Sequence, residues 1–162
     1  MSIQVIDGDV TKTDKDIIVQ QVNCMGAMGK GLALSIMVRY PNVRTEYMAF
    51  HKKQMKKAGT NRDLLGMVNY VDTYDEKIVA NIFGQVEYAK SKTDKTLYTE
   101  EKALLKGIQQ VKDKAEALGF SVAIPTFIGC GLANGDWNSI KPAIEAIFEG
   151  SGVDVMFYHH RK

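Results

Sequence analysis

No stretch of this chain approaches the ~18 consecutive apolar residues of a membrane-spanning helix. The first residues also lack the charged and then apolar pattern of a secretory signal peptide. We therefore expect a cytoplasmic protein that has no membrane partner. Internal repeats, low-complexity runs and linkers are absent as well. The 162 residues, 45% of them hydrophobic, predict a single domain that spans 1–162.

Cysteine is scarce, and neither sign of charge dominates. Cys24 and Cys130 are the two cysteines, and no suitably spaced histidine accompanies them, so we expect no metal site and no cofactor. Each thiol is expected to be a small residue in a tight loop.

The 21 basic and 19 acidic residues give a net charge of +2, which argues against obligatory wrapping by nucleic acid. Local basic patches remain, at 52–57 and 90–95.

Three glycines lie where a predicted strand meets a predicted helix. The apolar run 17–22 indicates a buried strand, and 32–40 indicates a helix. Gly26, Gly29 and Gly31 lie between them, where glycine allows a sharp turn and a close approach of ligand to backbone. The start of a helix directs free N–H groups into such a loop, which suits an anion or a phosphorylated ligand. The spacing fits neither the dinucleotide-binding nor the P-loop pattern, and an ordinary strand-to-helix turn is the alternative.

A second loop of the same kind follows a second buried strand. Residues 121–126 predict the strand, 127–137 are rich in glycine, and 138–148 predict a helix. Two such loops could close over one ligand from two sides. A ligand that contains a diphosphate suits this arrangement better than a single small anion.

Strands and helices alternate along the rest of the chain. Further strands are predicted at 3–6, 66–72, 77–85 and 153–158, and further helices at 42–57 and 97–118. The polar segment 84–96 is a candidate mobile loop. The alternation predicts a mostly parallel or mixed sheet that has helices on both faces. Ligands bind such sheets outside the carboxyl ends of the strands, where both glycine loops are expected.

Three segments resemble the macrodomain family: Gly8-Asp9-Val10-Thr11, the loop 22–31, and Ile128-Gly129-Cys130-Gly131-Leu132. The resemblance runs from about residue 3 to 158. It is closest to the branch that includes terminal ADP-ribose glycohydrolases, ADP-ribose-1''-phosphate phosphatases and antitoxins that remove ADP-ribose from DNA. The resemblance implies a three-layer α/β/α fold around a central mixed, mostly parallel sheet. It also implies a monomer whose partner is ADP-ribose or a derivative, either free or carried on protein or DNA.

The resemblance also implies roles for individual residues. Asp9 would accept a hydrogen bond from the adenine amino group, and Val10 would offer its backbone N–H. Tyr158 would stack on the adenine, and Phe157 is the neighbouring alternative because strand side chains alternate between faces. Lys30 would either neutralise phosphate or point into solvent. The diphosphate and the distal ribose would contact Asn23, Gly26, Met28, Gly29, Lys30, Gly31, Ile128, Gly129, Cys130, Gly131, Leu132, Ala133 and Asn134.

The catalytic positions depart from the glycohydrolase pattern. Those relatives use a nucleophilic lysine before the long helix and an aspartate directly after Gly-Cys-Gly-Leu. Here Ala133 stands at the second position, and the nearest acid is Asp136. Lys90, Lys92 and Lys95 all lie in the segment of the lysine, and Lys90 is favoured by its place in the chain. The phosphatase-like members match better, and there Asp136 would be a general acid or base, with a helix N-cap as the alternative.

These observations predict a hydrolase that acts at the 1'' position of ADP-ribose. Its substrate would be ADP-ribose-1''-phosphate or an ADP-ribosylated macromolecule. The alternative is a module that binds ADP-ribose without chemistry, and Ala133 favours it. An enzyme directed at nucleic acid would need 52–57 or 90–95 to contact DNA.

Overall fold

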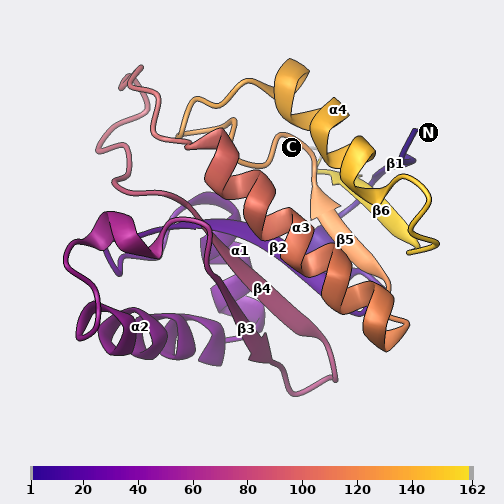
Figure 1. Cartoon of the computed structure of the whole chain (residues 1–162), viewed down its shortest axis with the longest axis horizontal. Coiled ribbons are helices and arrows are strands. Elements are labelled where there is room, and N and C mark those ends of the chain that lie inside the picture. The colour runs from indigo at the N-terminus through magenta and orange to yellow at the C-terminus, as the bar shows by residue number, and fades with distance from the viewer. Residues whose placement is uncertain (1, 161–162) are drawn as a thin grey trace.

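The computed structural model describes residues 2–160, and in them six strands form one sheet in the order β1-β6-β5-β2-β4-β3 (Figure 1). The strands are β1 (Val5–Asp7), β2 (Ile17–Asn23), β3 (Val68–Asp72), β4 (Ile78–Gln85), β5 (Val122–Pro125) and β6 (Val155–His159). All neighbours in this order pair in parallel except β3, which is antiparallel to β4. The predicted mixed, mostly parallel sheet is thus confirmed.

Helices cover both faces of the sheet. They are α1 (Gly31–Arg39), α2 (Asn42–Met55), α3 (Glu101–Leu118) and α4 (Trp137–Phe148), with the 3₁₀ turns η1 (Val10–Lys12) and η2 (Asn61–Leu64). Side chains of β2 alternate between the faces. Ile17 and Val19 lie in the core under α3 and α4, and Ile18 lies in the core under α1. Figure 1 shows α3 and α4 across one face, with α1 and α2 on the other, so the three-layer architecture is confirmed.

The long helix α3 starts later than its sequence pattern predicts. Leu104, Ile108 and Val111 form its buried stripe, and Gly119 ends it in the left-handed conformation at φ 69°. The prediction started this helix at residue 97, whereas the structure starts it at Glu101. Residues 98 and 99 instead donate their backbone N–H groups to a neighbouring loop, and this contact depends on the tertiary fold.

Strand β1 is a three-residue edge strand whose residues are all exposed. It pairs with β6 alone, and the amide of Gly8, directly after it, donates to the carbonyl of His159 at 2.9 Å. This pairing brings the turn that contains Asp9 beside the end of β6.

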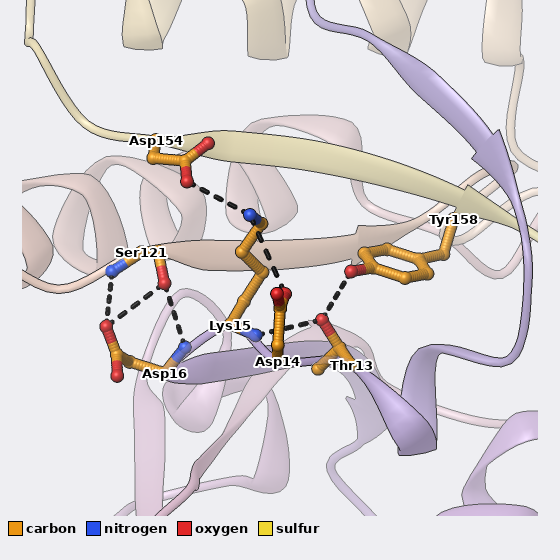
Figure 2. Close-up of polar contacts among 7 residues, drawn as sticks. All are labelled: Thr13, Asp14, Lys15, Asp16, Ser121, Asp154 and Tyr158. Carbon is orange, nitrogen blue, oxygen red and sulfur yellow. Dashed lines mark hydrogen bonds and ion pairs between the residues drawn. The ribbon is translucent and has the colours of Figure 1, made fainter.

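Polar contacts tie the strands together at the amino end of the sheet. The Asp16 carboxylate accepts hydrogen bonds from the amide and the hydroxyl of Ser121, at 2.8 and 3.0 Å (Figure 2). The Lys15 ammonium lies 3.0 Å from the carboxylate of Asp154. A pocket of about 340 Å³ lies at this end, which is opposite to the glycine loops. No helix in the described range 2–160 is both long and apolar enough to cross a membrane.

Candidate functional site

Four loops meet at the carboxyl edge of the sheet. Because β1, β2, β4 and β5 point the same way, the segments 8–9, 24–30, 86–100 and 126–136 all leave the sheet at this edge. Both predicted glycine loops are among them. The edge therefore gathers the backbone that the sequence singled out as a ligand site.

The side chain of Asn23 shapes the first glycine loop. Its Oδ1 accepts from the amides of Met25 and Ala27, at 3.0 and 3.3 Å, and its Nδ2 donates to the carbonyl of Ala27 at 2.7 Å. The Tyr47 hydroxyl of α2 donates to the Asn23 carbonyl at 2.7 Å. Asn23 therefore holds the loop, and a direct contact with ligand stays a prediction.

The glycines of this loop differ in their surroundings: one is required by the turn, and two leave open space beside the backbone. Gly26 has φ +77°, and a Cβ there would lie 2.8 Å from Nδ1 of His51, so the turn itself requires glycine. At Gly29 and Gly31 an added Cβ would meet no atom within 4 Å. Lys30 between them is exposed, and its side chain makes no capping hydrogen bond to α1. Met28 is half-buried and packs on the core, so the loop offers mainly backbone to a ligand.

The second glycine loop is folded tightly on itself. Gly129 has φ +73°, and its carbonyl accepts from the amide of Gly135 at 2.9 Å. A Cβ on Gly135 would lie 2.5 Å from that carbonyl oxygen, whereas one on Gly131 would meet nothing within 4 Å. Ile128 and Ala133 are buried, while Gly131 and Leu132 are exposed. The exposed tip of the loop is thus open on its outer side.

The segment 86–100 is fixed to the second loop, although the sequence suggested a mobile loop. Asn134 donates its Nδ2 to the carbonyls of Asp94 and Thr96, at 3.0 and 2.7 Å. The amides of Tyr98 and Thr99 donate to the carbonyl of Ala133, at 2.9 and 3.2 Å. A hydrogen bond from the Tyr98 hydroxyl holds the pKa of Asp94 below its usual value. These contacts join the two segments into one wall.

A glutamine that the sequence reasoning missed lies between the loops. Gln85 ends β4 opposite Asn23, and its Oε1 accepts from Nε2 of Gln21 at 2.8 Å. Lys90, the predicted nucleophile, comes five residues later and is exposed. The residue beside the first loop is therefore Gln85, whose side-chain amide cannot act as a nucleophile in the way that a lysine amine does.

Asp9 lies at the other end of the edge as the N-cap of η1. Its Oδ1 accepts from the amide and the hydroxyl of Thr11, at 2.9 and 2.7 Å. Burial raises the pKa of Asp9, but the hydrogen bonds from Thr11 and the charges of Lys12 and His160 outweigh it, so the net shift is downward. The backbone of Val10 follows directly, and its side chain is buried. The carboxylate is therefore available as a charged acceptor.

A pocket of about 570 Å³ opens beside Asp9. Leu34, Val38 and Tyr74 form its apolar lining, and its polar lining consists of Asp9, Thr11, Lys12, Ser35 and Arg39. Val38 and Tyr74 are 73% and 72% exposed. An apolar wall next to a carboxylate suits a planar base that carries an amino group.

Tyr158, the predicted stacking residue, is largely buried at the end of β6. The residue is 7% exposed, and its hydroxyl accepts a hydrogen bond from the hydroxyl of Thr13 (Figure 2). Phe157 is fully buried on the other face, 5.3 Å from the ring of Trp137. Stacking of Tyr158 on adenine therefore stays a prediction.

Replacing Asp9 tests the adenine end of the site. We expect Asp9→Asn to weaken binding of ADP-ribose about 2- to 12-fold, which corresponds to one hydrogen bond of ~0.5–1.5 kcal/mol. Asparagine keeps an oxygen acceptor for Thr11, so the fold should be retained. Calorimetry would measure the affinity, and ribose-5-phosphate is the control ligand because it lacks adenine. Equal affinity of the wild type for both ligands would refute the adenine assignment.

Asp136 caps α4, as the alternative reading of the sequence suggested. Its Oδ1 accepts from the amide of Asn138 at 3.0 Å, and the residue is exposed. It also lies close enough to Cys130 for its charge to act on that thiol. The structure thus gives Asp136 a structural contact at the end of the second loop, and its catalytic role stays a prediction.

Both thiols are expected to be unreactive. Burial raises the pKa of Cys24 to about 12, and burial together with the charges of Asp136 and Glu101 raises that of Cys130 to about 11. Because the thiolate is the reactive form, iodoacetamide at pH 7.5 should modify the native chain slowly and the unfolded chain fast. Intact mass spectrometry with and without denaturant measures both rates. Fast alkylation of native Cys130, the less buried thiol, would contradict the assignment.

Comparison with known proteins shows what this chain is similar to. No family model matches the chain. The curated DNA ADP-ribosyl glycohydrolase of Mycobacterium tuberculosis is 28% identical over 152 residues, which cover 93% of this chain and 40% of that protein. The chain therefore spans about two fifths of the length of the curated relatives that it matches.

Two solved structures are similar to this chain along nearly its whole length. The macrodomain protein from Streptomyces coelicolor superposes with a TM-score of 0.78 at 27% identity, over 99% of this chain and all of that one. The macrodomain of Mycobacterium tuberculosis DarG gives 0.76 at 27% identity, over 96% of both chains. With its sheet order, its covering helices and these likenesses along nearly all its length, the chain has the macrodomain fold.

Proposed function

We propose that the chain binds ADP-ribose along the carboxyl edge of the sheet. Adenine would lie at Asp9, the diphosphate along 128–135, and the distal ribose at 23–31. The observation that carries the proposal is the open backbone of the two glycine loops, which follow the adjacent parallel strands β2 and β5. An added Cβ would meet no atom within 4 Å at Gly29, Gly31 or Gly131. Loops of this kind hold phosphates through backbone N–H groups.

We further propose hydrolysis at the 1'' position of the distal ribose, with nucleic acid as the group released. The support is the curated relative, which is named a DNA ADP-ribosyl glycohydrolase. In the reaction, the oxygen of water bonds to C1'' as the bond to the leaving group breaks. One proton leaves the water and one reaches the leaving group, and Asp136 is the acid that the second loop offers for these transfers. ADP-ribose-1''-phosphate would react in the same way.

A route through a lysine adduct is disfavoured by two features. The residue that ends β4 beside Asn23 is Gln85, and Lys90 lies on the exposed part of its loop. Mass spectrometry of the chain during turnover should therefore detect no covalent ADP-ribose.

A binding module without chemistry is the second candidate. It is favoured by Ala133, which stands where related glycohydrolases carry an aspartate, and by the capping bond that already engages Asp136. Such a module would bind ADP-ribose or its conjugates at the same edge of the sheet.

One experiment separates the two candidates. The purified chain is incubated with ADP-ribose-1''-phosphate, an ADP-ribosylated oligonucleotide and an ADP-ribosylated protein, and chromatography resolves the products. We expect free ADP-ribose from the oligonucleotide. Binding in calorimetry without any product would favour the binding module, and absence of binding to ADP-ribose would overturn both proposals.

A further inference from the structure

We propose that four lysines at the end of α2 bind the phosphates of the nucleic acid that carries ADP-ribose. Lys52, Lys53, Lys56 and Lys57 form what we call the basic surface. The inference rests on the proposed function, because it concerns the nucleic acid that is released from the 1'' position of ADP-ribose. The inference assigns a binding surface on the protein to that nucleic acid.

The first support is the anchoring of α2 to the distal-ribose loop. Nε2 of His51 lies 2.7 Å from the carbonyl oxygen of Cys24, and its ring packs against Gly26. Beyond the helix, Nδ2 of Asn61 donates to Sδ of Met25 at 3.0 Å. The basic surface thus begins one residue after a direct contact with the loop 24–30. In Figure 1, α2 runs toward the side of the molecule at which β4 ends.

The second support is uncompensated charge. All four lysines of the basic surface are exposed, and within residues 2–160 none of them makes an ion pair. The nearest acids in the chain are engaged or distant. Asp63 accepts from the amides of Gly59 and Thr60, at 2.8 and 3.1 Å, and Glu46 precedes Lys52 by more than one turn of α2. By contrast, Lys112 on α3 is paired with Asp113 at 2.9 Å.

The third support is the match of scale and chemistry. At ~1.5 Å of rise per helical residue, the span 52–57 covers about 8 Å. A nucleic-acid strand carries one charge per about 3.4 Å of axis, so two or three successive phosphates fit this span. A net charge of +2 would not attract a polyanion by itself, so attraction must come from a local patch.

A salt titration tests the basic surface. Affinity for a single-stranded ADP-ribosylated oligonucleotide is measured between 50 and 200 mM salt, for the wild type and for K52Q/K53Q/K56Q/K57Q. Each lost phosphate contact should flatten the plot of log affinity against log salt by about 0.7. We expect the slope to fall by about 1.4 to 2.1, and the affinity to fall at low salt. The control is K106Q/K114Q/K141Q, which removes three lysines that make no ion pair within residues 2–160 from α3 and α4 on the other face of the sheet.

Further arms separate failure of this inference from failure of the proposed function. The affinity for free ADP-ribose measures binding at the carboxyl edge of the sheet alone. The affinity for the unmodified oligonucleotide measures binding at the basic surface alone. An unchanged slope in the α2 variant, or an equal change in the control variant, overturns the inference even if ADP-ribose binds. Absence of ADP-ribose binding overturns the proposed function, while the unmodified oligonucleotide still decides the basic surface. An equal salt dependence with an ADP-ribosylated acidic peptide overturns the assignment to nucleic acid.

Discussion

Gly131→Val should lower the affinity for ADP-ribose more than about 100-fold, or ~2.7 kcal/mol, while the domain stays folded. The position is exposed, and its backbone does not adopt the left-handed conformation that excludes a side chain. A Cβ there would meet no protein atom within 4 Å. Valine therefore costs the fold little, but its methyl groups would occupy the space in which a diphosphate lies against the backbone. Calorimetry measures the affinity, and thermal unfolding checks the fold.

Gly135→Val is the contrasting variant in the same loop. A Cβ at Gly135 would lie 2.5 Å from the carbonyl oxygen of Gly129, so this substitution should destabilise the domain itself. If Gly131→Val binds ADP-ribose like the wild type, the loop does not touch the ligand. If it unfolds as Gly135→Val does, the glycine serves the turn, and the proposed site loses its main support.

Asp136→Asn should reduce turnover about 10²- to 10⁴-fold with binding of ADP-ribose largely kept, because it removes an acid–base group from the end of the second loop. Asparagine is as good an N-cap as aspartate, so the bond to the amide of Asn138 can persist. Single-turnover assays on an ADP-ribosylated oligonucleotide measure the chemical step. Calorimetry on free ADP-ribose measures binding separately.

Asp136→Ala supplies the structural comparison. It removes both the acid and the cap, so it should also lower the free energy of unfolding by about 0.5–2 kcal/mol. Turnover of Asp136→Asn at the wild-type rate would leave the residue as a helix cap alone. The binding module would then be the better proposal if the wild type also releases no product.

The sequence predicts the layers of this fold well because their signals are local. The helix predicted at 32–40 is Gly31–Arg39, and the strand predicted at 17–22 is Ile17–Asn23. Apolar periodicity and glycine turns depend on residues that are close in the sequence, so they can be recognised without knowledge of the tertiary structure. The start of α3 was misplaced because the amides of Tyr98 and Thr99 bind Ala133, which lies far along the chain.

The site was predicted in outline, and its details required the packed structure. Glycine content located both loops, but the packing of a strand-end residue depends on the tertiary fold, so the burial of Tyr158 and its hydrogen bond from Thr13 could not be read from the sequence. Gln85 lies beside Asn23 only through the pairing of β4 with β2. Likewise, nothing local indicates that His51 of α2 reaches the carbonyl of Cys24.

The short strand β1 makes the proposed contact between Asp9 and adenine sensitive to local unfolding. Edge elements with few buried apolar contacts open by local fluctuation at low free energy. The turn that holds Asp9 depends on β1, whose three residues are exposed and pair with β6 alone. Each fraying event would therefore remove the adenine acceptor while the rest of the sheet stays closed. ADP-ribose that holds Asp9 in place would slow amide hydrogen exchange in β1, which couples ligand occupancy to the order of the first strand.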